Sequence, residues 1–507
     1  MTNNYEHRIR CKALLDKVIS VDQAVDMIKD GMTLGISGFT ITAEPKAIPL
    51  ALAKKIEATG EKIRVHMLSG ASVGDDCDGA LARVGGLLTR MPYQSGKDVR
   101  DSLNTVGGIR YIDQHLSMNP QDTRYGFFGD VDIAIIEACA ITEEGGIVPT
   151  TSLGSSPSFV QAAKKVLIEL NTVQMEALEG MHDIYTPLDP PNRQPIPLTE
   201  VGQRIGTPYI PCDIEKIAGI VITNTPDNVK KFKPIDETSQ AIAENIIGVL
   251  KKEVAEGRLP QNLLPLQSGV GSVANAVLAG LASSGFKNLS FYSEVIQDSA
   301  LSLIKQGVLD SCSGTSITPS PEGLVDFVEN IEFYKKHIVL RPQEISNNPE
   351  VARRLGVIAM NTAIEADIYG NVNSTHIMGT RMMNGIGGSG DFARSSFMSI
   401  FMTASTAKGG EISSIVPMVS HVDHTEHDVR FIITEQGVAD LRYLCPRERA
   451  LTIINNCSHP DFRPMLLDYY ERACKETPAG KAQTPHILSE ALSWHDRFNK
   501  TGTMKIK

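Results

Sequence analysis

Asn288-Leu-Ser-Phe-Tyr-Ser-Glu294-Val-Ile-Gln-Asp-Ser is one of two versions of the same segment in this chain, the earlier being Arg64-Val-His-Met-Leu-Ser69-Gly70-Ala-Ser. Both contain a short apolar run of the kind that forms a buried strand. When the two are aligned, Ser293-Glu294 falls where Ser69-Gly70 falls. One copy therefore has a carboxylate at the end of its strand, which is where open α/β sheets bind their ligands.

Two further blocks repeat in the same order. Thr33-Leu-Gly35-Ile-Ser-Gly38 resembles Leu266-Gln-Ser-Gly269-Val-Gly271, and Ala134-Ile-Ile-Glu137-Ala resembles Thr362-Ala-Ile-Glu365-Ala. The offsets from Gly35 to Gly269, from Ser69 to Ser293 and from Glu137 to Glu365 are 234, 224 and 228 residues. Three blocks at a nearly constant offset indicate an internal duplication.

Strand-like and helix-like patterns alternate along the chain, which favours parallel α/β sheets. Val131–Glu137 and Ala218–Thr223 are β-branched runs typical of buried parallel strands, and 158–168 reads first as helix and then as strand. A proline-rich loop over 185–197 precedes an amphipathic helix that begins at Glu237. We therefore predict two duplicated open α/β domains, residues 1–229 and 230–507.

The composition of the 507 residues is that of a globular protein, with 42% hydrophobic and 21% charged residues. A net charge of −10 argues against a nucleic-acid partner. No apolar run reaches the roughly 18 residues of a membrane span. The polar N-terminus and eight scattered cysteines without a C-x-x-C pair favour the cytoplasm, and we expect neither disulfides nor a zinc site.

Two glycine-rich turns could bring backbone N–H groups to a ligand. Gly269-Val-Gly271-Ser-Val-Ala274 opens a helix and nearly matches the dinucleotide-binding turn, with Glu294 about 20 residues further on, where such folds bind ribose. An NAD-binding oxidoreductase and a simple packing turn are therefore alternatives. Asn384-Gly-Ile-Gly-Gly388-Ser-Gly390 could form a nest of donors for an anion or oxyanion, or a surface loop.

Glu294 could act as nucleophile, base or ribose ligand, and as nucleophile it needs an activated electrophile such as a thioester. The segment His421-Val-Asp-His424-Thr-Glu-His427 has the composition of a metal site, but it follows an apolar strand without a water-activating motif. Hydrogen-bonded histidines at a strand end are the simpler interpretation, and we predict no metal.

Five blocks of this sequence together resemble the acetyl-CoA hydrolase/transferase branch of the class I coenzyme A-transferases. They are Ser268-Gly-Val-Gly-Ser-Val-Ala-Asn-Ala-Val, Tyr292-Ser-Glu294-Val-Ile-Gln-Asp, Glu365-Ala-Asp-Ile-Tyr-Gly-Asn-Val-Asn-Ser-Thr, Met383-Asn-Gly-Ile-Gly-Gly-Ser-Gly-Asp-Phe and Thr434-Glu-Gln-Gly. The resemblance covers nearly the whole chain. It implies two related CoA-transferase α/β domains with the active site at their junction, and a homodimer.

The resemblance assigns roles by motif. Glu294 would be the nucleophile, the N–H groups of Val270 and Gly388 the oxyanion hole, and Asn347 and Glu435 the polar groups around the nucleophile. Gly38 would help to wall the carboxylate pocket. The implied contacts with coenzyme A are Gly269, Val270, Gly271, Ser272, Val273, Ile364 through its backbone, Gly388 and Lys408.

The activity so implied is transfer of CoA from succinyl-CoA, or a similar acyl-CoA, to acetate or another short carboxylate, with no tightly bound cofactor. Acetyl-CoA hydrolysis, propionyl-CoA:succinate transfer, 4-hydroxybutyrate transfer and a non-catalytic CoA-binding protein are alternatives. One departure from the family pattern is Asn228, in Thr223-Asn-Thr-Pro-Asp-Asn228, where relatives are expected to carry an arginine. It puts contacts with the CoA tail or between the domains in doubt.

Overall fold

The computed structural model describes residues 5–72, 74–477 and 481–506. By their contacts these residues form two compact units. The first unit holds residues 1–231, 291–305 and 309–355, and the second holds 232–290, 306–308 and 356–507. This division differs from the sequence-based one, because 291–305 and 309–355 pack with the N-terminal part of the chain. The predicted boundary at 229/230 lies close to the first crossing between the units.

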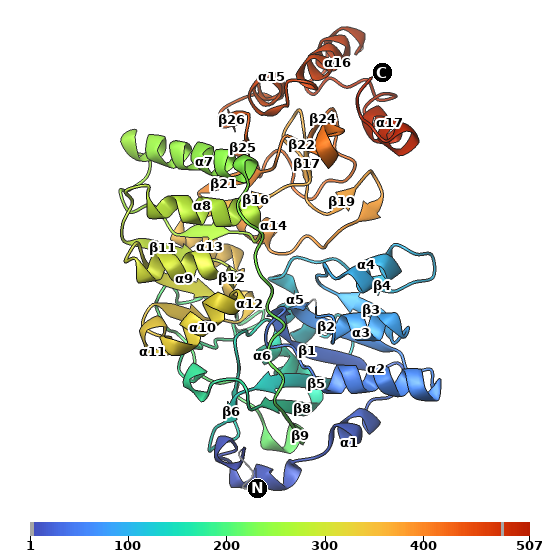
Figure 1. The fold of residues 1–507 in the computed structure, drawn as a ribbon, viewed down its shortest axis with the longest axis vertical. Helices are drawn as coiled ribbons and strands as arrows, with labels where there is room; N and C mark the ends of the chain where they lie inside the picture. Colours follow the sequence, from blue (N-terminus) through green and yellow to red (C-terminus); the bar gives the residue numbers. More distant parts are fainter. Residues whose placement is uncertain (1–4, 73, 478–480, 507) are drawn as a thin grey trace. The chain divides into compact units, whose positions relative to one another are not determined.

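The first unit is built on a seven-stranded parallel sheet of order β4-β3-β2-β1-β5-β8-β9 (Figure 1). Its strands are β1 (Thr33–Thr40), β2 (Val65–Ser72), β3 (Leu87–Met91), β4 (Arg110–Tyr111), β5 (Val131–Ala138), β8 (Ala163–Asn171) and β9 (Ile217–Thr223). The helices between them are α1 (Val21–Asp26), α2 (Ile48–Thr59), α3 (Asp78–Arg83), α4 (Lys97–Leu103), α5 (Met118–Arg124) and α6 (Ser156–Ala162). The hairpin β6 (Ala140–Ile141) and β7 (Ile147–Val148) follows β5.

Helix α2 shows how the sequence fixes these elements. Its apolar face, with Ile48, Leu52 and Ile56, packs in the core formed with the side chains of β1, β2 and β5. The carboxylate of Glu169 in β8 accepts the N–H groups of the residues that open the helix, including Ile48 at 2.6 Å. An acidic group at a helix N-terminus satisfies donors that have no partner within the helix. The helix ends at Gly60, which adopts a left-handed conformation.

The later segments of the first unit carry the candidate nucleophile. They contain the end of β11 (Leu289–Tyr292), β12 (Val295–Ile296), α9 (Asp298–Lys305), β13 (Leu309–Gly314), β14 (Ser316–Ile317), α10 (Pro321–Glu329), α11 (Ile331–Tyr334), β15 (Ile338–Leu340), α12 (Gln343–Ser346) and α13 (Pro349–Leu355). The strand order is β15-β13-β11, and β12 pairs in parallel with β14.

The second unit contains a sheet of order β10-β16-β21-β25-β26, parallel except for the last strand. Its strands are β10 (Leu266–Ser268), β16 (Ile358–Thr362), β21 (Met398–Met402), β25 (Phe431–Thr434) and β26 (Gly437–Asp440). Short strands surround it: β17 (Glu365–Asp367), β18 (Val372–Asn373), β19 (His376–Ile377), β20 (Arg381–Met382), β22 (Thr406–Ala407), β23 (Ile412–Ser413) and β24 (Ile415–Val416). Its helices are α7 (Glu237–Ala255), α8 (Ser272–Ala282), α14 (Ser389–Ala393), α15 (Pro446–Cys457), α16 (Arg463–Glu476) and α17 (Ser493–Thr501).

Strand order repeats along the chain. The order β15-β13-β11 corresponds to β4-β3-β2, and β10-β16-β21-β25 corresponds to β1-β5-β8-β9. In this scheme two of the three repeated sequence blocks fall on corresponding strands, whereas the third does not, since Glu137 lies in β5 and Glu365 in β17. Ser69 lies in β2 and Ser293 directly follows β11. Gly35 lies in β1 and Gly269 directly follows β10. The predicted α/β class with parallel sheets is therefore confirmed, and the repeat in sequence corresponds to a repeat in topology.

Candidate active site

Glu294 lies directly after β11 and before β12, and both its backbone and its side chain are held. Its carbonyl oxygen accepts the N–H groups of Thr315 (2.8 Å) and Ser316 (3.1 Å). Asn347 Nδ2 donates to Glu294 Oε1 at 2.8 Å. Burial raises the pKa of Glu294 to about 7, and the bond from Asn347 acts in the opposite direction. Perturbed carboxyl groups of this kind are frequent at catalytic sites.

An apolar cluster lies next to Glu294 in the same unit. Phe39, Ala71, Leu116 and Val295 are buried together, and Tyr93 packs against them. Burial raises the pKa of Tyr93 to about 12, and the negative charge of Glu294 adds to this rise. The carboxylate therefore has buried apolar side chains beside it, which limit the access of water.

Glycines allow the segments around Glu294 to approach one another. Gly38 has φ +101°, and a Cβ on Gly70 would lie 2.5 Å from the Gly38 carbonyl oxygen and 2.9 Å from Gly154 Cα. Gln343 N, at the start of α12, donates to Gly154 O at 2.9 Å. Because α12 leads directly to Asn347, this close backbone contact helps to place the partner of Glu294.

The turn after β10 has the geometry of a ligand-binding loop in the second unit. Gly269 N donates to Met360 O at 3.1 Å, so the turn is tied to β16. Gly271 has φ +116°, a conformation that requires glycine, and α8 begins at Ser272. Val270, which lies between the two glycines, is 48% exposed.

The second glycine cluster is fastened by a histidine. Gly387 has φ +63°, and Gly388 directly precedes α14. The hydroxyl of Ser389 donates to Ile386 O at 3.0 Å and lies 3.0 Å from Nε2 of the buried His424. The His424 ring stacks on Phe401 with 4.6 Å between centroids. The cluster is therefore an anchored turn and not a loose surface loop.

His421 of that segment has other partners. His421 Nε2 lies 3.3 Å from Asp423 Oδ1, and its ring stacks on His376 at 4.0 Å. Among the residues that the structure describes, no group of three or more His, Cys, Asp and Glu side chains could hold a metal ion.

Three more residues expected at the site lie in the second unit. Glu435 accepts hydrogen bonds from the backbone N–H of Ser405 at 2.8 Å and from the Ser405 hydroxyl. Burial would raise the pKa of Glu435, but the hydrogen bonds from Ser405 and Gln436 outweigh it and lower that pKa. Ile364 N donates to Asn373 O at 2.9 Å. Lys408 lies in the turn between β22 and β23, with its ammonium 4.8 Å from the centre of the Phe498 ring.

The structure thus distributes the expected site residues between its two units. Glu294 and Asn347 are in contact within the first unit. Glu435, the other polar group expected near the nucleophile, belongs to the second unit. The residues expected to bind CoA and the oxyanion also belong to the second unit: Gly269, Val270, Gly271, Ser272, Val273, Ile364, Gly388 and Lys408.

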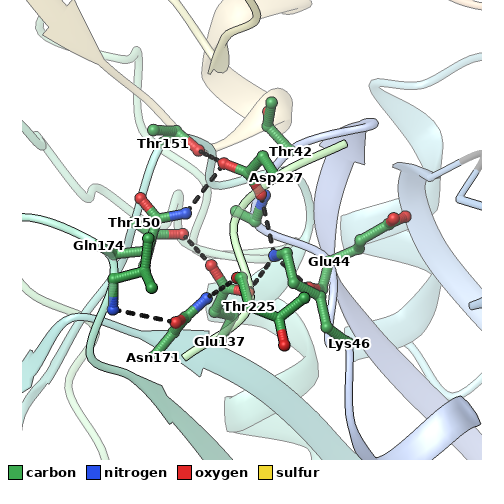
Figure 2. A network of polar contacts seen from close by, with 12 residues as sticks. Thr42, Glu44, Lys46, Glu137, Thr150, Thr151, Asn171, Gln174, Thr225 and Asp227 are labelled. Carbon is green, nitrogen blue, oxygen red and sulfur yellow. Dashed lines mark hydrogen bonds and ion pairs between the residues drawn. The ribbon is translucent and has the colours of Figure 1, made fainter. Parts of the chain in front are cut away.

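A buried ion cluster in the first unit was not expected from the sequence. The ammonium of Lys46 lies between the carboxylates of Glu137 and Asp227, and its distance to Asp227 Oδ1 is 2.9 Å (Figure 2). Burial raises the pKa of Glu137 to about 7, even though the ammonium acts to lower it. Asp227 Oδ2 also accepts bonds from Thr151 (3.0 Å) and Gln174 (2.9 Å).

This cluster anchors the segment that leads to Asn228, the position at which an arginine was expected. Ala43 N donates to Asp227 Oδ1 at 3.1 Å, and Asn171 Nδ2 donates to Thr225 O at 2.7 Å. The chain just before Asn228 is therefore fixed to the first unit by Asp227. The only local signal was the Thr-Pro-Asp sequence before Asn228, and it does not reveal a partner as distant in sequence as Lys46.

Comparison with known proteins identifies the family. Residues 2–222 match the acetyl-CoA hydrolase/transferase N-terminal domain, and residues 322–470 match the C-terminal domain of the same family. The chain is 58% identical to succinyl-CoA:acetate CoA-transferase of Clostridium kluyveri, over 99% of this chain and 92% of that protein. It is 46% identical to acetyl-CoA hydrolase of Candida glabrata, over 99% of this chain and 98% of that protein.

Solved structures share the fold at low sequence identity. RipA from Yersinia pestis matches with a TM-score of 0.68 and 21% identity, over 90% of this chain and 97% of that one. The 4-hydroxybutyrate CoA-transferase of Porphyromonas gingivalis matches with a TM-score of 0.61 and 22% identity, over 90% of this chain and 98% of that one. Membership is shown by the two family domains and the relatives: the chain belongs to the acetyl-CoA hydrolase/transferase family and is an enzyme of the CoA-transferase type.

Proposed function

We propose that this enzyme transfers CoA from succinyl-CoA, or a similar acyl-CoA, to acetate or another short carboxylate, with Glu294 as the nucleophile. The observation that carries the proposal is the Glu294 carboxylate itself, which is bound by Asn347 and lies beside an apolar cluster. The activity printed for the 58% identical relative points the same way. Membership of this family favours acyl-CoA chemistry over an NAD-binding interpretation of the Gly269 turn.

The reaction is a series of acyl transfers in which atoms balance without a further reactant. A Glu294 oxygen attacks the thioester carbon, the C–S bond breaks, and an acyl-glutamyl anhydride and CoA thiolate form. The thiolate attacks the glutamyl carbonyl, which releases the donor acid and leaves a glutamyl-CoA thioester. The acceptor carboxylate then attacks that thioester, and the returning thiolate takes the new acyl group and regenerates Glu294.

The other expected residues serve these steps. The N–H groups of Val270 and Gly388 stabilise the oxyanion formed at each attack, and such donors contribute about 10²- to 10³-fold to rate. Asn347 and Glu435 orient the polar groups around the nucleophile. Gly269–Val273, the backbone of Ile364, Gly388 and Lys408 bind CoA.

Hydrolysis is the alternative that the comparisons favour next, since the 46% identical relative is an acetyl-CoA hydrolase. It differs only in the final acceptor, which is water instead of a carboxylate. The apolar cluster of Phe39, Ala71, Leu116 and Val295 beside Glu294 favours transfer, because both glutamyl intermediates must be kept from water.

Intact-mass analysis after incubation with succinyl-CoA and no acceptor acid tests the proposal. We expect a gain equal to CoA less one water on the peptide containing Glu294, and loss of this adduct when acetate is added. The E294Q variant should form no adduct, whereas E332Q, which changes an exposed glutamate of α11, should behave like the wild type. Steady release of CoA without an adduct would indicate hydrolysis, and neither adduct nor turnover would refute the nucleophile.

We further propose a homodimer located in the cytoplasm. The dimer rests on the family resemblance, and the location rests on the scattered thiols, since the described structure contains free cysteines. None of the described helices is both long and apolar enough to cross a membrane. Light scattering of the purified protein would test the oligomeric state.

A further inference from the structure

The turn that carries Lys408 has an unusual backbone. Lys408, Gly409 and Gly410 have φ values of +53°, +67° and +87°, so three successive residues are left-handed. For a residue with a side chain this conformation is strained. The side chain of Lys408 is exposed, yet its backbone needs contacts from elsewhere to keep the turn in this shape.

Helix α17 supplies such a contact to the lysine side chain. The Lys408 ammonium lies 4.8 Å from the centre of the Phe498 ring. Phe498 is only 9% exposed and belongs to the hydrophobic cluster that includes Trp494 and Met504, against which Ile412 of the same turn region packs. The ring is therefore a fixed surface, and a cation over an aromatic face is attracted to it.

The C-terminal segment that contains α17 also contacts two residues that are close in sequence to expected CoA contacts. His495 Nε2 lies 2.8 Å from Glu365 Oε2, both side chains are buried, and Glu365 directly follows Ile364. Met504 N donates to the carbonyl oxygen of Glu411, next to the Lys408 turn, at 2.9 Å. Figure 1 shows α17 near the C-terminus, in red.

It matters that the partner of the Lys408 ammonium is an aromatic ring and not a carboxylate. In the described part of the chain, no carboxylate lies within ion-pair distance of Lys408. A carboxylate would neutralise the charge that a phosphate needs, whereas an aromatic face holds the ammonium and leaves its charge available. Lysine binds phosphate as a point charge, so its exact position decides the strength of the contact.

From these contacts we infer that α17 is a positioning element for coenzyme A, in which Phe498 holds the Lys408 ammonium at the place where the nucleotide phosphates bind. The inference rests on the proposed function, which assigns Lys408 to CoA. Helix α17 lies beyond the family-domain match, which ends at residue 470. Phe498 acts through Lys408 and does not itself touch the reacting atoms.

The test compares F498L, which keeps apolar volume but has no aromatic face, with F498Y, which keeps the face. Calorimetry with CoA gives Kd, and steady-state assays with acyl-CoA give KM and kcat. We expect F498L to raise Kd and KM about two- to fivefold with unchanged kcat. The F498Y variant should have the Kd and KM of the wild type. The change N499A, at an exposed position of the same helix, should leave Kd and KM unchanged, and thermal melting checks that the variants are folded.

A second comparison separates positioning from general damage. In a K408M background, F498L should have no further effect on Kd, because the cation is already absent. An acyl-pantetheine thioester, which lacks the nucleotide, should show the same KM with F498L as with the wild type. An equal increase in KM for this truncated thioester, or a further increase of Kd in the K408M background, would overturn the inference.

The results also separate this inference from the proposed function. If K408M weakens CoA binding but F498L does not, only the proposed role of Phe498 is refuted. If K408M leaves Kd unchanged, the assignment of Lys408 to CoA falls together with the inference. Formation of the glutamyl-CoA adduct at Glu294 is an independent observation and stands in either case.

Discussion

Replacing Asn347 by alanine should move the pH dependence of glutamyl-CoA formation upward by about one unit. Only the ionised form of Glu294 attacks a thioester, so the rate should rise with pH through the pKa of this group, which is about 7. The Asn347 Nδ2 bond at 2.8 Å favours the ionised form. Its removal therefore raises the pKa of Glu294 further.

The size of the shift follows from the strength of that bond. A hydrogen bond to a charged group contributes about 1.5 kcal/mol at the low end of its usual range. One pKa unit corresponds to about 1.4 kcal/mol, so the pKa should rise by about one unit. At pH 7 the ionised fraction then falls from about one half to about one tenth, a roughly fivefold loss of rate that disappears near pH 9.

The assay is a quenched single turnover with succinyl-CoA, in which the mass adduct on Glu294 is followed from about pH 5.5 to 9. The control is N348A, because the Asn348 amide donates to Glu344 O at 3.0 Å and not to the nucleophile. An N347A profile with the wild-type midpoint but a lower plateau would show that Asn347 positions Glu294 without tuning its pKa. A wild-type rate independent of pH would refute the link to ionisation altogether.

Three other changes test parts of the structure outside this bond. K46M removes the ammonium between two buried carboxylates and should lower the free energy of unfolding by about 3–5 kcal/mol in urea titrations, whereas K164M, at an exposed position, should not. G70A places a Cβ 2.5 Å from the Gly38 carbonyl oxygen, so we expect about 1–3 kcal/mol of destabilisation, and a wild-type melting temperature would contradict the close approach. Hydrogen bonds from two arginines lower the pKa of Glu253 to about 2, so its stabilising contribution is present above pH 4.5 and is lost as pH falls toward 2. The E253Q variant should be less stable at pH 7 and should lose less stability in that acid range when unfolding is followed by circular dichroism.

Local sequence patterns predicted several of the regular elements. The run 158–168 was expected to be helix and then strand, and α6 and β8 meet there at residues 162 and 163. The helix expected from Glu237 is α7, which ends at Ala255. These elements could be predicted because burial on one helical face or on both faces of a strand leaves a pattern in neighbouring residues.

The division into compact units could not be predicted in the same way. The repeat suggested one boundary near residue 230, but 291–305 and 309–355 pack with the N-terminal part of the chain. Which unit a segment joins depends on contacts such as Gln343 N to Gly154 O, between residues far apart in sequence. No periodicity within either segment reports on such contacts.

For the candidate site too, local features could be predicted and long-range contacts could not. Glu294 and both glycine turns could be found from the sequence, because a strand end and a glycine-rich turn are local features. Asn347 and Lys408 came only from a family resemblance, and their proposed roles stay predictions. The Asn347–Glu294 bond joins residues 53 positions apart, and nothing near either residue in the sequence announces it.

The sequence by itself therefore determined the α/β class, the internal repeat and the family, and it predicted Glu294 as the nucleophile. Tertiary structure alone decided the ion cluster of Lys46 with Glu137 and Asp227 and the contact of Phe498 with Lys408, and it gave the hydrogen bond from Asn347 to Glu294. The physical reason is the separation, along the sequence, of the residues that interact. Strand and helix patterns arise from residues a few positions apart, whereas a buried charge or a held cation needs a partner that only the folded chain brings near.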